Sequence, residues 1–129
     1  MIKIIHNAFS PSAFSKIKET LESEKFPWYY AETTAYTSKD TNYNTLYNGS
    51  FAHVALNDCK KNSDISDALE YCFLNMADRE NIRVNRIYRI RIGMITATPE
   101  NTINPPHIDL IGPHMVGLLY LNDSDGEDR

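Results

Sequence analysis

The hydrophobic residues of this chain change their period near Asn81, and that change constrains the fold more than any other feature. Upstream, apolar side chains recur every three or four residues in two segments, 11–24 and 65–76, which is the spacing of helices that bury one face. Downstream, from Val84 to Ile95, apolar and polar residues alternate, as they do in a β-strand. The chain therefore predicts an α+β fold.

Both predicted helices begin at a serine. Ser10-Pro11 combines a side chain that can cap free amides with a proline suited to the first helical position. Ser63 is the corresponding cap of the second helix, and Pro27 ends the first. The predicted inner faces are Ala13, Phe14, Ile17 and Leu21 in the first helix, and Ile65, Ala68, Leu69, Cys72, Phe73 and Met76 in the second.

Further strands follow from short runs of β-branched, aromatic and aliphatic residues. We expect polar, turn-rich or proline-rich loops between them. The predicted strands are 2–6, 28–37, 51–56, 107–110 and 114–122, and the predicted loops are 38–50 and 96–106.

Length, charge and cysteine content limit the functional classes. A chain of 129 residues is expected to form one domain. Its net charge of −4 disfavours nucleic-acid binding. The two cysteines, Cys59 and Cys72, fit a reduced intracellular protein better than a disulfide scaffold. Apolar runs of the length that spans a membrane, about 20 residues, are lacking. These features predict a cytoplasmic protein without a membrane partner.

The best candidates for a functional site are His107 and Asp109, in the stretch Pro106-His107-Ile108-Asp109. Residues i and i+2 of a strand point to the same face, so both side chains can approach one metal ion. An imidazole nitrogen and a carboxylate oxygen suit Fe(II), Mn(II) or Zn(II). A further histidine on a neighbouring strand would complete a facial triad and leave positions open for a cosubstrate and dioxygen.

The order of these features resembles the prolyl-4-hydroxylase-like branch of the 2-oxoglutarate and Fe(II)-dependent oxygenases, in particular small members from marine phages and bacteria. The residues that carry the resemblance are Arg89-Ile90-Arg91, Pro106-His107-Ile108-Asp109, His114 and Leu119-Tyr120-Leu121-Asn122-Asp123-Ser124-Asp125-Gly126. The resemblance covers residues 84–127 well and the N-terminal half in general layout. Each motif alone is weak, whereas the ordered set is fairly specific.

The resemblance implies N-terminal helices packed on an incomplete double-stranded β-helix of the jelly-roll or cupin type. Residues 1–82 would form its support region, and residues 83–129 the start of its core. His107 and Asp109 would be iron ligands, and Tyr120 would help to hold the distal carboxylate of 2-oxoglutarate. The implied activity is hydroxylation with Fe(II), 2-oxoglutarate and dioxygen, and the family pattern also allows ascorbate. If the chain is phage-encoded, its expected location is the host cytoplasm.

The family's third iron ligand is a downstream histidine followed by a basic residue, and no residue follows Arg129. We therefore expect a truncated homologue, with an open edge along the strand from Met115 that favours self-association. Two alternatives stay open. One is an inactive relative that serves as a binding or structural module. The other is a zinc-binding protein or hydrolase that uses His107, Asp109 and His114.

Overall fold

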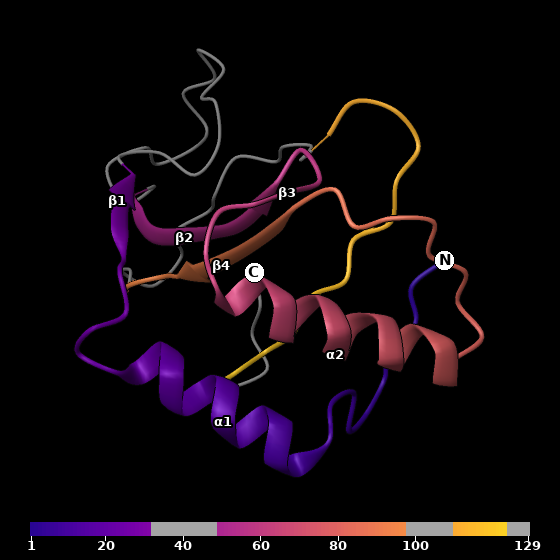
Figure 1. Ribbon diagram of the computed structural model, residues 1–129, viewed down its shortest axis with the longest axis horizontal. Coiled ribbons are helices and arrows are strands. Elements are labelled where there is room, and N and C mark those ends of the chain that lie inside the picture. The colour runs from indigo at the N-terminus through magenta and orange to yellow at the C-terminus, as the bar shows by residue number, and fades with distance from the viewer. Residues whose placement is uncertain (32–48, 98–109, 124–129) are drawn as a thin grey trace. The chain divides into compact units, whose positions relative to one another are not determined.

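The computed structural model of the chain describes residues 1–31, 49–97 and 110–123. These residues form a mixed α+β structure with an open antiparallel sheet (Figure 1). The class predicted from the sequence is confirmed at this level. The elements, in order, are α1 (Pro11–Glu22), β1 (Tyr29–Ala31), β2 (Ser50–Asn57), β3 (Lys60–Lys61), α2 (Ile65–Arg79) and β4 (Ile90–Met94).

Strand β2 is the one with which the other described strands pair. The start of β2 pairs antiparallel with β1, with Tyr30 opposite Phe51. Its end pairs antiparallel with β3, with Leu56 opposite Lys61. Strand β4 also pairs with β2. Because β2 is the longest strand, it provides the ladder to which the shorter strands add.

A tight turn at Asp58 and Cys59 joins β2 to β3. Both residues have positive φ angles, 50° and 60°, which is the backbone of the two-residue hairpin turn that matches the twist of its strands. Aspartate is among the residues that adopt this left-handed conformation most readily, whereas for a cysteine such as Cys59 the conformation is sterically unfavourable. The Cys59 amide donates to the Tyr88 carbonyl at 3.0 Å, a bond that helps to hold the turn in place.

The chain divides into two compact units. Unit 1 comprises Met1–Pro27 and His53–Ile92, and unit 2 comprises Trp28–Ala52 and Gly93–Arg129. Unit 1 contains both helices, β3 and parts of β2 and β4, and unit 2 contains β1 and the remaining strand residues.

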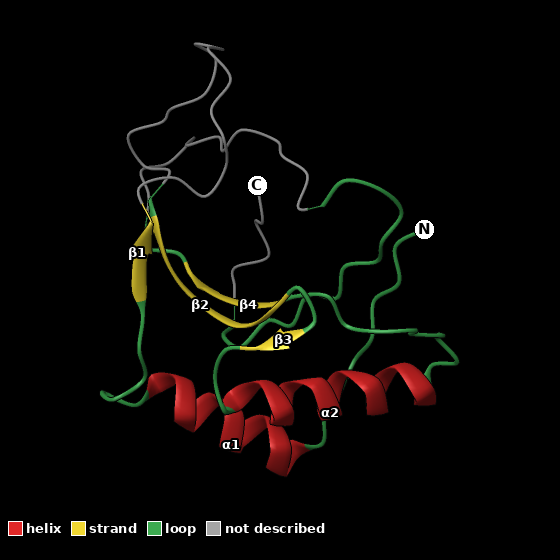
Figure 2. Cartoon of the chain, turned by 45° about the horizontal axis from the view of Figure 1, so that its top comes forward, coloured by secondary structure: helices red, strands yellow, loops and turns green. Residues whose placement is uncertain are grey.

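The hydrophobic core of unit 1 lies between its helices and its strand residues. Both helices lie on the same side of these strands (Figure 2). The buried apolar side chains come from both layers: Phe9, Ile17, Leu21, Leu69 and Ala77 from the helical side, and Ala55, Leu56, Ile90 and Ile92 from the strands. An edge-to-face contact between Phe9 and Phe73, with ring centroids 5.1 Å apart, closes the core near the start of α1.

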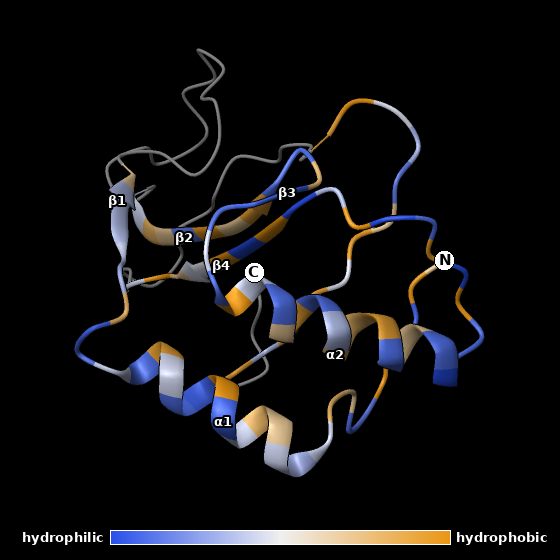
Figure 3. Ribbon diagram, in the orientation of Figure 1, coloured by the Kyte–Doolittle hydropathy of each residue, from blue (hydrophilic) through white to orange (hydrophobic). Residues whose placement is uncertain are grey.

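Helix α1 begins where its sequence predicts. The Ser10 hydroxyl accepts a hydrogen bond from the Ala13 amide at 3.3 Å, and Pro11 occupies the first turn. Ile17 and Leu21 are buried, and the hydrophobic side of the helix is visible in Figure 3. The helix ends at Glu22, so Pro27 is not what terminates it.

Helix α2 is rotated slightly from its predicted orientation. Leu69 is buried as expected, but Ala68 is exposed and Ser66 is buried in its place. Two hydrogen bonds close the C-terminal end, from the Asn81 amide to the Asp78 carbonyl and from Ile82 to Ala77, with Asn81 at φ 55°. This left-handed cap explains why the helical pattern stops at Asn81. Within the described ranges, neither helix is long and apolar enough to cross a membrane.

Three strand predictions differ from the structure. Residues 2–6 form no strand, the strand predicted over 84–95 is limited to Ile90–Met94, and residues 114–122 form neither helix nor strand. Alternation or a short run of apolar residues is therefore not sufficient here, because a strand also needs a neighbour for its backbone hydrogen bonds. The predicted loop residues 38–48 and 98–106, most of the strand 28–37 and residues 107–109 lie outside the described residues.

Candidate functional site

The two predicted metal ligands, His107 and Asp109, lie outside the described residues. Within residues 1–31, 49–97 and 110–123, three or more histidine, cysteine, aspartate or glutamate side chains that could hold a metal ion do not come together. That search does not reach His107 or Asp109, so the metal site stays a prediction from the sequence. Its donor set, one imidazole and one carboxylate, fits Fe(II) chemically.

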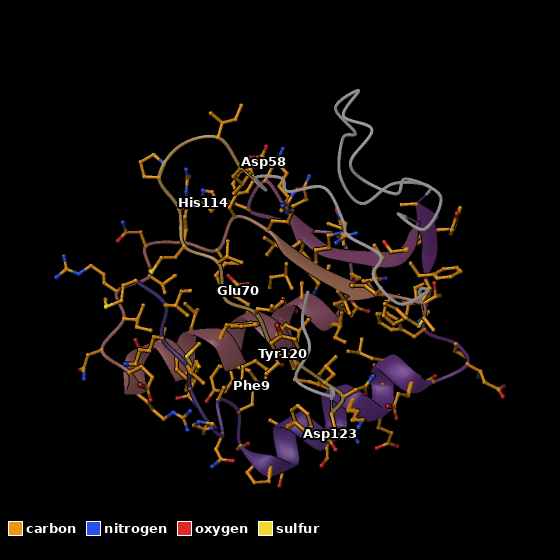
Figure 4. The ribbon with its side chains drawn as sticks, turned by 180° about the vertical axis from the view of Figure 1, so that it is seen from behind. Phe9, Asp58, Glu70, His114, Tyr120 and Asp123 are labelled. Atoms are coloured by element: carbon orange, nitrogen blue, oxygen red, sulfur yellow. The ribbon has the colours of Figure 1, made fainter. Side chains whose placement is uncertain are left out.

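Tyr120 and His114, the other residues of the predicted site region, both belong to unit 2. Tyr120 is 56% exposed. The exposed His114 ring makes a local hydrogen bond, with Nδ1 2.8 Å from the Gly112 carbonyl oxygen. Because a carbonyl only accepts, Nδ1 is the donor in this hydrogen bond. The two side chains lie apart along their segment (Figure 4).

The two arginines of the Arg89-Ile90-Arg91 motif differ in exposure. Arg91 is exposed within β4, whereas Arg89, which precedes the strand, is half-buried. The adjacent Ile90 and Ile92 are both buried. This pattern confirms the predicted alternation at the centre of the segment, with an apolar face and an arginine-bearing face.

The described residues bring together a different polar group, which lies within unit 1. Nδ1 of His53 lies 2.8 Å from the Pro27 carbonyl oxygen, and Nε2 lies 2.7 Å from the Ser63 hydroxyl oxygen. The Phe26 ring packs against the imidazole, with centroids 4.5 Å apart. His53 is only 5% exposed, so these contacts satisfy a buried polar ring.

The β2–β3 hairpin explains why His53 and Ser63 meet. The register pairs Asn57 with Lys60 and Leu56 with Lys61, which directs the following residues back along β2. The amides of Asn62 and Ser63 both donate to the Ala55 carbonyl, at 2.8 and 3.2 Å. The chain leaves the ladder at this point and enters α2, with Ser63 close to His53.

Charged side chains surround the start of α2. The Lys61 ammonium contacts the carboxylates of Asp67 at 2.6 Å and Asp64 at 3.5 Å. The hydrogen bond that Lys61 donates to Asp67, together with the charges of both carboxylates, raises the pKa of Lys61 above its usual value. Lys61 therefore stays protonated and offsets the negative charge beside Ser63.

The sequence did not predict the pair of His53 and Ser63. The serine before α2 indicated a helix cap, but Asp64 occupies the cap position and its side chain makes no capping hydrogen bond. The Ser63 hydroxyl contacts His53 instead, while its carbonyl accepts from the Ser66 amide at 3.1 Å. A polar histidine within the apolar run of β2 was the available signal, and the hairpin that supplies its partner was not predicted.

Comparisons of the chain with protein-family models, curated proteins and solved structures find no significant match. The resemblance to the oxygenases therefore depends on the sequence motifs alone.

Proposed function

We propose that this chain is a non-haem Fe(II)- and 2-oxoglutarate-dependent hydroxylase, or the N-terminal part of one. The observation that carries the proposal is the motif Pro106-His107-Ile108-Asp109, followed by an apolar segment that ends in Tyr120-Leu121-Asn122. The arginine-bearing face that β4 presents and the two helices beside an antiparallel sheet are consistent with it. The finer architecture that we propose is a jelly-roll core, of which these strands are a part.

In this proposal His107 and Asp109 hold the iron through an imidazole nitrogen and a carboxylate oxygen. The Tyr120 hydroxyl donates a hydrogen bond to the distal carboxylate of 2-oxoglutarate. Its exposed side chain in unit 2 is accessible to such a ligand. When bound, Fe(II) with 2-oxoglutarate supplies the activation of dioxygen that hydroxylation requires.

Anaerobic calorimetric titration of the chain with Fe(II) tests the proposed ligands. We expect binding by the unmodified chain and its loss in His107→Ala and Asp109→Ala. His114→Ala is the matched control, because His114 is a nearby exposed histidine outside the proposed ligand pair. Equal iron binding by all four proteins would overturn the assignment of His107 and Asp109.

Zinc tests the alternative site. A zinc protein that uses His107, Asp109 and His114 would retain zinc through dialysis and would lose it in His114→Ala. Retained zinc with this dependence would replace the oxygenase proposal by the zinc proposal. Loss of zinc during dialysis, combined with Fe(II) binding, would support the oxygenase.

A second candidate function, a binding module without catalysis, is favoured by one observation. Large apolar side chains between residues 111 and 120 are exposed, among them Ile111, Met115, Val116 and Leu118. Such a surface favours association with another chain. A stable dimer that forms equally with and without Fe(II) would favour this candidate over the hydroxylase.

A further inference from the structure

The contact between His53 and Ser63 has the arrangement of a nucleophile with its base. A serine hydroxyl becomes nucleophilic when an adjacent base accepts its proton and a third group orients that base. Here the hydroxyl oxygen lies 2.7 Å from Nε2, and the Pro27 carbonyl holds Nδ1 at 2.8 Å. We propose that Ser63 is an activated nucleophile that takes acyl groups from small esters, with His53 as its general base.

The partners of His53 define the protonation state that this role requires. The Pro27 carbonyl can only accept, so Nδ1 of the neutral ring carries the proton and donates it to that oxygen. Nε2 then has the lone pair and accepts from the Ser63 hydroxyl. The imidazole is thus in the tautomer that can remove the serine proton, and the backbone holds it there.

Burial fixes the base while the nucleophile is nearer the surface. His53 is 5% exposed and packs against Phe26, which restrains the ring. Ser63 is half-buried at the start of α2. Part of Ser63 is therefore exposed to an approaching ester, while the base is more deeply buried.

The start of α2 supplies a favourable field for the negative charge that develops on the ester carbonyl oxygen. Amides in the first turn of a helix lack helical acceptors and attract anions. The carboxylates of Asp64 and Asp67 oppose this attraction, but Lys61 pairs with both. The local charge beside Ser63 is consequently less negative than the two aspartates alone would make it.

The proposed reaction is an acyl transfer in two stages. Ser63 Oγ attacks the ester carbonyl carbon, and its proton passes to Nε2 of His53. The bond to the leaving alkoxide breaks, and His53 returns the proton to form the alcohol. Water then attacks the acyl-serine with His53 again as the base, which releases the carboxylic acid and restores the hydroxyl.

The test uses p-nitrophenyl acetate and the full chain, without added metal or 2-oxoglutarate, so its outcome is independent of the oxygenase proposal. We expect release of p-nitrophenolate and acetylation of Ser63, located by peptide mass spectrometry. Ser63→Ala removes the nucleophile on which His53 acts, so the general-base contribution of about 10²- to 10⁴-fold to acyl transfer is lost with it and the rate should fall at least tenfold. Ser10→Ala is the matched control, because Ser10 also stands before a helix but bonds to a backbone amide.

A second measurement keeps the test valid if replacement of His53 disturbs folding. Nitrogen-15 NMR of the unmodified chain should report His53 as the neutral tautomer protonated on Nδ1. Three outcomes would overturn the proposal. They are an equal rate for Ser63→Ala and the unmodified chain, acetylation confined to lysines or tyrosines, and a His53 protonated on Nε2 alone.

Discussion

Unit 1 and unit 2 differ in how deeply their hydrophobic side chains are buried. Within the described residues, every buried apolar side chain lies in unit 1. In unit 2 the described large apolar residues are either exposed or half-buried: Tyr29, Met94 and Leu118 are exposed, and Phe51 and Leu119 are half-buried. The residues expected to carry the oxygenase chemistry, by contrast, belong to unit 2.

This difference in burial indicates which part of the chain supplies most of the free energy of folding. Burial of apolar surface is the dominant favourable contribution, and the described residues provide it in unit 1. Unit 1 is therefore expected to act as the scaffold. Unit 2, with its exposed apolar segment, should open with a smaller free energy than unit 1.

The largest effect that tests this comparison is loss of a core leucine. Leu69 is 4% exposed in α2, whereas Leu118 in unit 2 is 73% exposed. Leu69→Ala should lower the free energy of unfolding by about 2–5 kcal/mol. Leu118→Ala should change it by less than about 0.5 kcal/mol. Chemical denaturation, monitored by circular dichroism, measures both changes in the free energy of unfolding. Equal effects of the two substitutions would contradict the assignment of unit 1 as the scaffold.

A smaller effect is expected at the start of α1. Ser10→Ala removes the hydroxyl that accepts from the Ala13 amide, and should lower the free energy of unfolding by about 1 kcal/mol. Ser15→Ala is the control, because Ser15 is exposed inside the same helix and alanine there favours the helix. If the two variants were equally stable, the Ser10 cap would have no energetic role.

The smallest effect concerns the ion pair of Lys3 and Glu80, whose charged atoms lie 2.8 Å apart. The hydrogen bond from Lys3 lowers the pKa of Glu80 in the folded state. The stabilisation is therefore present above the pKa of the unfolded chain and is lost as the pH falls through the folded-state pKa. Glu80→Gln should be slightly less stable than the unmodified chain at neutral pH.

This difference should disappear at acid pH and at high salt, because the pair is exposed to screening. Thermal unfolding of both proteins across a pH series measures it. A stability difference that grew as the pH fell would contradict the assigned role of Glu80.

Local sequence signals predicted unit 1 best. Ser10 and Pro11 defined the start of α1, and the spacing of Ile17 and Leu21 defined its buried face. These predictions succeeded because a cap and an amphipathic face depend on residues within one or two turns.

Predictions that depended on distant partners were less successful. Ser63 has the same local signal as Ser10, but its hydroxyl forms a hydrogen bond with His53, ten positions upstream. The strand predicted over 114–122 is absent for a related reason, since strand pairing depends on a neighbouring strand that a local run of apolar residues does not reveal. His107 and Asp109 could be proposed from the sequence because their residue types and spacing suit a metal ion and the motifs around them resemble those of the oxygenases.

Anaerobic absorption spectroscopy tests the proposed oxygenase function most directly. The chain would be mixed with Fe(II), and the visible spectrum recorded before and after addition of 2-oxoglutarate. We predict a visible charge-transfer band that depends on both components, is lost in His107→Ala and Asp109→Ala, and persists in His114→Ala. A chain that gives no band, or a band that survives both ligand substitutions, would contradict the proposal that these 129 residues form an iron and 2-oxoglutarate site.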